Sequence, residues 1–560
     1  MPGLQKLLID TPYETNQQRM LRGNIIQTIG FLFDAVKASD QNEESFKEDA
    51  KKVMEIFSGI LSSEEIKVND SIVTAITGAI TQLAALMKED FAPFMPDLMT
   101  KLFEDSQVEV DFKLEDAELP NTNDEDLTTV TFKLKGLEGQ KKLSLNTNAL
   151  ETKINAIGVT KALAQNLGTT YEPYVPATVE KFVPLFAYKF SRAVRGCAVE
   201  CCQYLILALS KESDRIELMQ SLTPAFEQCL AQYLERKDTD EVVTLLKEYY
   251  HCIREFKYPN APLSETQIET IIKLCAESCK LAAEDKILTC EEIEKERHNI
   301  DEEDLEVYKE KLDEIEKAFM YTMEIAGQLM RMHRDDVTDV VKTHLSELFA
   351  KNIDKAENTE HEIIDSLCFF IDCCEFLSLD YFAEIYEACV EKFFSVYEKF
   401  KDADDRDLVQ SCAFGLGVIA QRLPSDKFQV YAERVYQTLL TVISVPDPFD
   451  DDNGYATDNS ISSLLKLVYY QKDACGVSEQ EVQRYLDFLP LQQDLDESIA
   501  ANKLLIEQVE NKNQSLFGVD NANINHVKEA LQRIAELHAD EPELKILDDE
   551  YNKRLLALIY

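Results

Sequence analysis

Amphipathic helices that recur in pairs constrain the fold of this chain more than any other feature. Apolar residues at i, i+3, i+4 and i+7 spacing predict one helix after another, separated by short polar breaks. Val194 follows Ile154 by 40 positions and Ile461 follows Val409 by 52, each at the start of such a helix. Two helices in roughly 40–47 residues, lengthened by loop insertions, are typical of HEAT and armadillo repeats. Because one helix pair cannot bury its apolar face alone, we predict an all-α HEAT-repeat solenoid, a superhelix of stacked antiparallel helix pairs.

The individual helices follow from the same spacing. Each expected segment carries apolar residues mostly on one face and ends near a turn-forming residue. The expected helices are Met20–Ala38, Phe46–Ser62, Ile72–Lys88, Ile154–Leu167, Tyr174–Lys189, Arg192–Lys211, Ile216–Leu234, Glu241–Phe256, Glu265–Leu281, Ile363–Leu377, Tyr381–Phe400, Asp407–Arg422 and Lys427–Ser444.

Two segments interrupt the repeats. In residues 108–143, the alternating stretches VEVDFKL and TVTFKLKG predict two short strands around an acidic turn, which we interpret as a β-hairpin insertion. Residues 286–318 are strongly charged and predict a helical insertion with an acidic joint, or a solvated helical spacer. The expected organisation is therefore HEAT repeats in 1–107, the acidic insertion 108–143, repeats in 144–285, the charged insertion 286–318, and C-terminal repeats in 319–560.

Charge restricts the partners that the chain can bind. The 560 residues include 58 Lys and Arg against 104 Asp and Glu, a formal net charge of −46. Such a chain repels nucleic acid and anionic membranes, so neither is an expected partner. It attracts basic proteins over long range, although acidity also serves simply to keep a large protein soluble.

The 14 cysteines predict buried free thiols. Cys197 and Cys201 are one helical turn apart in the apolar segment AVRGCAVECCQYL, and no pair of CxxC type stands beside a histidine or a second such pair. Free thiols in this number indicate a reducing compartment. The opening residues lack the pattern of a signal peptide, and no stretch has the roughly 20 apolar residues that span a bilayer.

Catalytic motifs are missing from the sequence. We find no GxSxG, GxxxxGK[ST] or HExxH, and we expect neither enzymatic activity nor a cofactor or metal. The GLG at Gly415–Gly417 lies within a helix, where it predicts close helix–helix approach rather than phosphate binding. The acidic loop Asp447–Asn459 fails the register of a calcium-binding EF-hand, because its last ligand position holds Asp458 and no glutamate follows there.

Acidic residues on the second helix of each pair are the candidate site. In a solenoid this helix lines the concave face, where spaced carboxylates receive Lys and Arg of an extended segment. Glu200, Glu248, Asp365 and Asp372 are the candidate cargo-binding residues. The alternative for each of them, taken singly, is an ordinary solvated helix position.

Five stretches resemble one family, the importin-β-type karyopherins, and within it the importin beta-3 branch. They are residues 1–36 (MPGLQKLLIDTPYETNQQRMLRGNIIQTIGFLFDAV), Leu143–Lys153 (LSLNTNALETK), Tyr174–Arg195 (YVPATVEKFVPLFAYKFSRAVR), Leu408–Leu423 (LVQSCAFGLGVIAQRL), and the run NGYATDNSISSLLKL with LDFLPLQQDLDESIAANKLLIEQVENKNQSLFG within 453–518. Their order and spacing follow the branch from end to end. The resemblance covers the whole chain but only the C-terminal half of the family protein.

The resemblance implies a nuclear transport receptor, monomeric, that shuttles between cytoplasm and nucleus. Its implied partners are basic cargo such as ribosomal proteins or histones, FG-repeat nucleoporins bound in apolar clefts between neighbouring outer helices, and the GTPase Ran, whose GTP form releases cargo. An alternative from another class is a HEAT-repeat scaffold subunit of a non-transport assembly. Irregular periods and acidic insertions favour the receptor, since scaffolds of this kind have more regular repeats.

Overall fold

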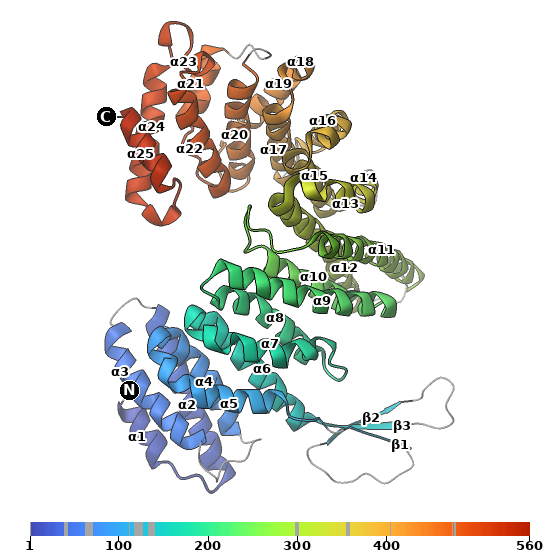
Figure 1. Cartoon of the computed structure of the whole chain (residues 1–560), viewed down its shortest axis with the longest axis vertical. Coiled ribbons are helices and arrows are strands. Elements are labelled where there is room, and N and C mark those ends of the chain that lie inside the picture. The colour runs from blue at the N-terminus through green and yellow to red at the C-terminus, as the bar shows by residue number, and fades with distance from the viewer. Residues whose placement is uncertain are drawn as a thin grey trace. The chain divides into compact units, whose positions relative to one another are not determined.

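The protein forms two compact units, residues 1–267 and 268–560. The structure, a computed structural model, describes residues 2–38, 43–61, 71–110, 112–116, 127–132, 141–296, 302–353, 359–403, 405–472, 474 and 478–559. Within each unit, helices follow one another as antiparallel pairs (Figure 1). The predicted HEAT-repeat solenoid is confirmed.

The described residues of unit 1 form five helix pairs. Its second helices, α2, α4, α6, α8 and α10, pack side by side in sequence order, and each first helix packs on the second helix of its own pair. The helices are α1 (Pro2–Asp10), α2 (Asn16–Ala38), α3 (Glu43–Leu61), α4 (Ser71–Met87), α5 (Met95–Ser106), α6 (Thr147–Leu167), α7 (Val175–Phe182), α8 (Arg192–Ala208), α9 (Glu212–Arg236) and α10 (Thr239–Ile253).

Unit 2 repeats this arrangement, and its second helices α12, α15, α17, α20, α22 and α25 form the corresponding row. The helices are α11 (Glu265–Glu296), α12 (Glu302–His333), α13 (Thr338–His344), α14 (Ser346–Ile353), α15 (Glu360–Phe376), α16 (Leu379–Phe400), α17 (Asp407–Arg422), α18 (Ser425–Phe428), α19 (Ala432–Val442), α20 (Gly454–Tyr470), α21 (Glu479–Asp487), α22 (Leu495–Glu510), α23 (Gln514–Phe517), α24 (Ile524–Asp540) and α25 (Asp549–Ile559).

Several predicted helix boundaries are wrong; the helix expected over Lys427–Ser444, for example, is divided into α18 and α19. The helix expected over Tyr174–Lys189 ends as an α-helix at Phe182, and a 3₁₀ turn follows over Val183–Ala187. Pro184 explains this change, because proline has no N–H to donate and its ring clashes inside an α-helix. The helix expected to end at Leu281 runs to Glu296, so the charged residues 286–318 include the end of α11 and the start of α12.

The insertion after α5 contains strands, but the predicted hairpin is wrong in its pairing. Strands β1 (Phe112–Asp116) and β2 (Leu127–Phe132) both pair antiparallel with a third strand, β3 (Lys141–Asn146), which lies between them. The acidic residues between β1 and β2 lie outside the described residues. The strand β3 was missed because KKLSLN lacks the β-branched and aromatic residues that signal a strand.

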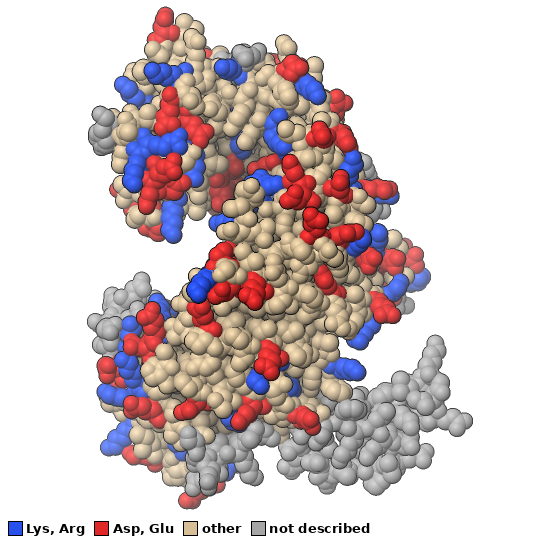
Figure 2. All heavy atoms as spheres, in the orientation of Figure 1, with Lys and Arg blue, Asp and Glu red and all other residues tan. Residues whose placement is uncertain are grey.

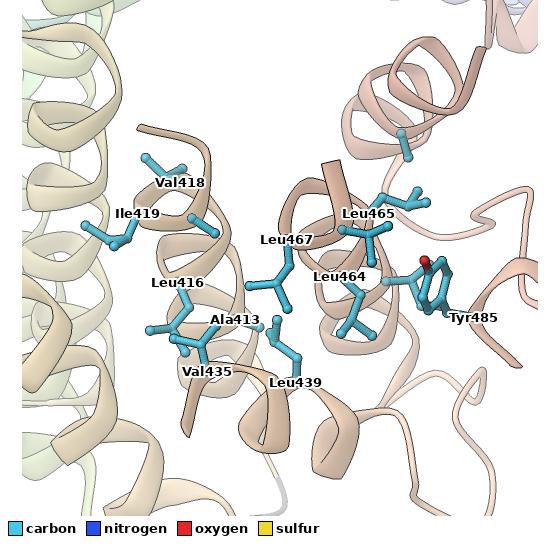
Figure 3. Close-up of a cluster of buried hydrophobic side chains, with 14 of the residues drawn as sticks. Ala413, Leu416, Val418, Ile419, Val435, Leu439, Leu464, Leu465, Leu467 and Tyr485 are labelled. Atoms are coloured by element: carbon cyan, nitrogen blue, oxygen red, sulfur yellow. The ribbon is translucent and has the colours of Figure 1, made fainter. Parts of the chain in front are cut away.

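The core of unit 2 is continuous across consecutive repeats. Leu416 of α17, Leu439 of α19 and Leu464 of α20 are fully buried and belong to one hydrophobic cluster (Figure 3). Tyr485 of α21 extends the same cluster into the next pair. Each repeat therefore completes the core of its neighbour.

Glycines set the closest approach in this core. A Cβ added at Gly415 would lie 2.8 Å from the ring of Phe393, and one at Gly417 would lie 3.1 Å from the Cα of Ser463 on α20. Ser463 also donates a hydrogen bond to the carbonyl oxygen of Ala413 at 2.9 Å. The prediction that GLG permits close helix–helix approach is confirmed.

Polar side chains link the ends of successive second helices in unit 2. The guanidinium of Arg422 donates to the Leu377 carbonyl at the end of α15, with both Nη atoms within 3.1 Å. The amide of Gln471 donates at 2.7 Å to the carbonyls of Ala420 and Leu423 at the end of α17. Asn513 donates at 3.3 Å to Val468, near the end of α20. We call these bonds the carbonyl ladder; they satisfy helix-end carbonyls that have no partner within their own helix.

We predict that Gly417→Ala destabilises the protein. The new methyl group must displace the backbone of α20, and overpacking of this kind costs about 1–3 kcal/mol. The control is Gly158→Ala in α6, where an added Cβ meets no atom within 4 Å. Removing glycine from an open helical position stabilises by roughly 0.5–1 kcal/mol. Thermal unfolding of the two variants should move in opposite directions, and an unchanged melting temperature for Gly417→Ala would contradict the close packing.

Candidate site on the second helices

All four predicted acidic residues lie on second helices. Glu200 is on α8 and Glu248 on α10 in unit 1, whereas Asp365 and Asp372 are both on α15 in unit 2. Glu248, Asp365 and Asp372 are buried, and only Glu200 is partly exposed. The structure therefore groups the candidates into one pair in each unit and leaves them little accessible surface. Their role as cargo contacts stays a prediction.

In unit 1 the acidic pair already has basic neighbours. Lys161 of α6 donates to Glu200 at 2.6 Å. Glu248 lies 3.5 Å from both Lys247 and His251, and burial raises the pKa of its carboxyl. Burial also lowers the pKa of His251, with Arg254 and Lys247 adding to that effect. Because a neutral imidazole carries no charge, the pair depends on Lys161 and Lys247 for compensation.

In unit 2 the Asp365 carboxyl lacks a cation. Its side chain is 9% exposed and lies near the carboxylates of Glu324, Glu362 and Glu316. Lys286 compensates two of these, at 2.9 Å from Glu316 and 2.8 Å from Glu362. Among the described residues, neither Asp365 nor Glu324 forms an ion pair. Burial and these like charges raise the pKa of Asp365 to about 7.

Asp372, two helical turns further along α15, does have a partner. The Arg331 guanidinium of α12 approaches its carboxylate at 3.1 Å. Burial nevertheless outweighs this cation and raises the pKa of Asp372 to about 7, with Glu375 and Glu324 contributing repulsion. Glu324 thus faces both aspartates, and the three carboxyls form what we call the α12–α15 acidic site.

The acidic residues Glu362 and Glu375, which the sequence prediction missed, follow a pattern that the sequence shows. Glu362, Asp365, Asp372 and Glu375 follow one another at intervals of three and seven, which places them on one face of α15. Glu324 is not identified by such spacing, because only the packing of α12 on α15 brings it to the aspartates.

A second candidate site is an apolar cleft between the first helices α14 and α16. It has a volume of about 410 Å³, and its floor is formed by Leu367 and Phe370 of α15. Ala350 of α14 and Ala388 of α16 lie on opposite walls, and both are exposed. Small side chains on the walls and aromatic or aliphatic ones on the floor leave room for an apolar group of a ligand. The volume falls in the usual range of binding pockets.

The remaining surface offers other sites less support. Figure 2 shows acidic side chains interspersed with basic ones on the visible face, so the acidic excess does not form one continuous surface there.

Within the part of the chain that the structure describes, no cluster of His, Cys, Asp or Glu is arranged to hold a metal ion. The described cysteines are free, and most are buried as predicted, but Cys290 is exposed and Cys197 and Cys368 are partly exposed. None of the described helices is long and apolar enough to cross a membrane.

Fold and site together define a HEAT-repeat solenoid, and this fold is similar to that of solved karyopherins. The chain is similar to solved structures of Kap121p over its whole length, with a TM-score of 0.69 at 16% identity, and it covers 50% of that protein. Structures of Kap121p bound to RanGTP and to Nup53p match with TM-scores of 0.67 and 0.65, at 14% and 13% identity. These likenesses establish the fold.

The chain is also similar in sequence to a curated protein. The chain is 24% identical over 512 residues to a probable importin-5 homolog of Dictyostelium discoideum, covering 88% of this chain and 44% of that protein. It therefore spans about half the length of the relatives it matches. No family model matches the chain. The predicted resemblance to the importin-β-type karyopherins is confirmed.

We predict that Asp365→Asn stabilises the protein, and more so at pH 8 than at pH 5. The folded-state pKa of about 7 lies above the unfolded value of 3.8, so the folded state binds the extra proton. Stability linked to this group is present below pH 4 and is lost as the pH rises through 7. Because asparagine does not titrate, the Asp365→Asn protein does not lose this stability as the pH rises. Melting temperatures of both proteins at the two pH values test this, and an equal shift at both would contradict the raised pKa.

Proposed function

We propose that the chain is a nuclear transport receptor of the karyopherin-β type, with no catalytic role. It binds basic import cargo at the α12–α15 acidic site and FG-repeat nucleoporins in the α14–α16 cleft, and Ran-GTP regulates cargo release. It shuttles between cytoplasm and nucleus. The observation that carries the proposal is the similarity of the chain, over its whole length, to the Kap121p fold, together with its resemblance in sequence to a probable importin-5 homolog.

The acidic site supports cargo binding because it has more carboxyls than cations paired with them among the described residues. Glu324 lies near both buried aspartates, and Arg331 supplies the one cation paired with these three carboxyls among the described residues. A lysine or arginine side chain from an extended basic segment would complete that balance, and hydrogen bonds to charged groups contribute about 1.5–3 kcal/mol. A basic protein also gains long-range attraction from the net charge of −46.

The apolar cleft supports nucleoporin binding through its size and position. It lies between neighbouring first helices, which is where the family resemblance implies FG contacts, and its floor presents the Phe370 ring. An inserted phenylalanine would find aromatic and aliphatic contacts on three helices. Kap121p itself has been solved with Nup53p and with RanGTP, which supports this partner set.

We predict that Glu324→Gln with Asp365→Asn weakens binding of a basic import-signal peptide by about tenfold, equivalent to 1.4 kcal/mol. The matched control is Glu217→Gln with Glu235→Gln, which removes two charges from exposed positions of the first helix α9. Binding to wild type should also weaken between about 0.05 and 0.3 M salt, because screening shortens the acidic field. Fluorescence anisotropy measures both effects; equal affinities of the two double variants would argue against this site.

We predict that Ala388→Trp abolishes binding of an FG-repeat peptide while leaving the basic peptide bound. The indole would fill the space between α14 and α16 from an exposed position, so the core remains intact. Ala231→Trp, at an exposed position of α9, is the control and should bind both peptides normally. Wild-type protein that retains neither peptide at low salt would refute the receptor and favour the HEAT scaffold.

A further inference from the structure

Helices α11 and α12 extend past the helices that follow them in unit 2. Each has 32 residues, whereas α14 has 8 and α15 has 17. Thr359, the N-cap residue of α15, donates a hydrogen bond from its hydroxyl to Glu316 of α12 at 3.1 Å, which marks where α15 begins beside α12. Lys286 of α11 lies 2.9 Å from the same glutamate. The α12 residues before Glu316 and the α11 residues after Lys286 therefore run beyond α15, and we call them the projecting pair.

A groove lies at the base of the projecting pair, and the end of α14 and the start of α15 close one end of it. Its volume is about 530 Å³. Its α11 wall carries Ala283, Ile287 and Cys290, which follow one another at helical spacing, and its α12 wall carries Ile315 and Phe319. The walls are therefore mainly apolar.

Apolar side chains are exposed on the projecting pair. Ile287 is 61% exposed in the groove, and Leu288 of α11 and Val307 of α12 are 58% and 61% exposed. Where α15 does lie against α12, the corresponding side chains are covered: Met330 is buried and its sulfur lies 3.8 Å from that of Cys373 on α15. Exposed apolar residues gathered in this way mark an interaction surface.

The charges that line the groove are mostly negative. They belong to four glutamates and one lysine, Glu291, Glu294, Glu316, Glu362 and Lys286. Lys286 bridges the two deeper carboxylates, at 2.9 Å from Glu316 and 2.8 Å from Glu362. Glu291 and Glu294 are exposed at the rim, where Lys295 lies 3.4 Å from Glu291. A partner whose apolar residues are flanked by Lys or Arg complements such a lining.

We propose that this groove binds one amphipathic helix of another protein, with its apolar face against Ile287 and Phe319 and with Lys or Arg toward the rim glutamates. The bound helix takes the place that a longer α15 would occupy, so it packs on α11 and α12 as helices of the stack pack on one another. Residues 302–315 of α12 span roughly 21 Å, or about four helical turns. Because one helix of this length makes a small interface, we expect a micromolar dissociation constant. The proposal does not depend on the transport function.

Fluorescence anisotropy of the full chain with a labelled peptide of about 18 residues tests the site. The peptide has Leu at i, i+3, i+4 and i+7 spacing and Lys at the flanking positions, and a scrambled peptide of the same composition measures attraction by charge alone. We expect the scrambled peptide to bind at least about tenfold more weakly. Ile287→Gln should weaken binding of the helical peptide about tenfold, because it removes an apolar contact without changing charge. Leu379→Gln is the matched control, since Leu379 is 66% exposed at the first position of α16.

The rim glutamates have their own test. Glu291→Gln with Glu294→Gln should weaken binding of the helical peptide more than Glu217→Gln with Glu235→Gln, which removes two charges from exposed positions of α9. Equal affinities of these two double variants would overturn the role of the rim.

Alkylation of Cys290 locates the bound peptide. This thiol is exposed and lines the groove, whereas Cys197 is partly exposed on α8 in unit 1. Saturating helical peptide should slow the reaction of Cys290 with N-ethylmaleimide about tenfold and leave that of Cys197 unchanged. An unchanged rate at Cys290, equal binding of the scrambled peptide, or wild-type affinity of the Ile287→Gln protein overturns the proposal. Protection of Cys290 by an FG-repeat peptide and not by the helical one would assign the groove to an extended segment and overturn it as well.

Discussion

Burial between neighbouring second helices is the interaction on which each unit depends. No pair has a core of its own, so every pair is stable only when the pairs on either side cover it. In unit 2 this apolar packing is fixed in register by two devices. Gly417 lets α17 and α20 approach backbone to backbone, and the carbonyl ladder ties the ends of α15, α17 and α20 to residues of the following pair. A slip by one helical turn would leave the Leu423 carbonyl and the Gln471 amide buried without partners, which is costly.

The repeat architecture was predictable because its cause is periodic. Apolar spacing within a helix and the recurrence of helix pairs are both one-dimensional patterns, and so is the mid-helix position of Gly415 and Gly417. The pairing of β1 and β2 through β3 was not predictable, because strand order depends on contacts that alternation along the sequence does not encode. The α-helix that ends at Phe182 shows a different failure. The helical spacing of apolar residues continues past Pro184, but proline cannot donate the backbone hydrogen bond that an α-helix needs there.

The candidate site was only half predictable for a related reason. The sequence prediction placed Asp365 and Asp372 on a second helix, which is correct. The sequence did not indicate how deeply these side chains are buried, because the burial of a carboxyl depends on the neighbouring helix. Packing of α12 brings Glu324 to the aspartates and Arg331 to Asp372, and this combination leaves Asp365 without a cation. Buried acids of this kind reduce stability, a property that is common where residues are retained for binding rather than for folding.

The strands between α5 and α6 have a consequence for how such a chain can vary. They leave the stack at the turn between the two helices of one pair and return at the start of the second helix, so the row of second helices passes from α4 to α6 without interruption. An appendage at this turn can therefore lengthen, shorten or be exchanged without altering the packing of any repeat. The turn is a natural attachment point, at which the same scaffold can be fitted with a different module.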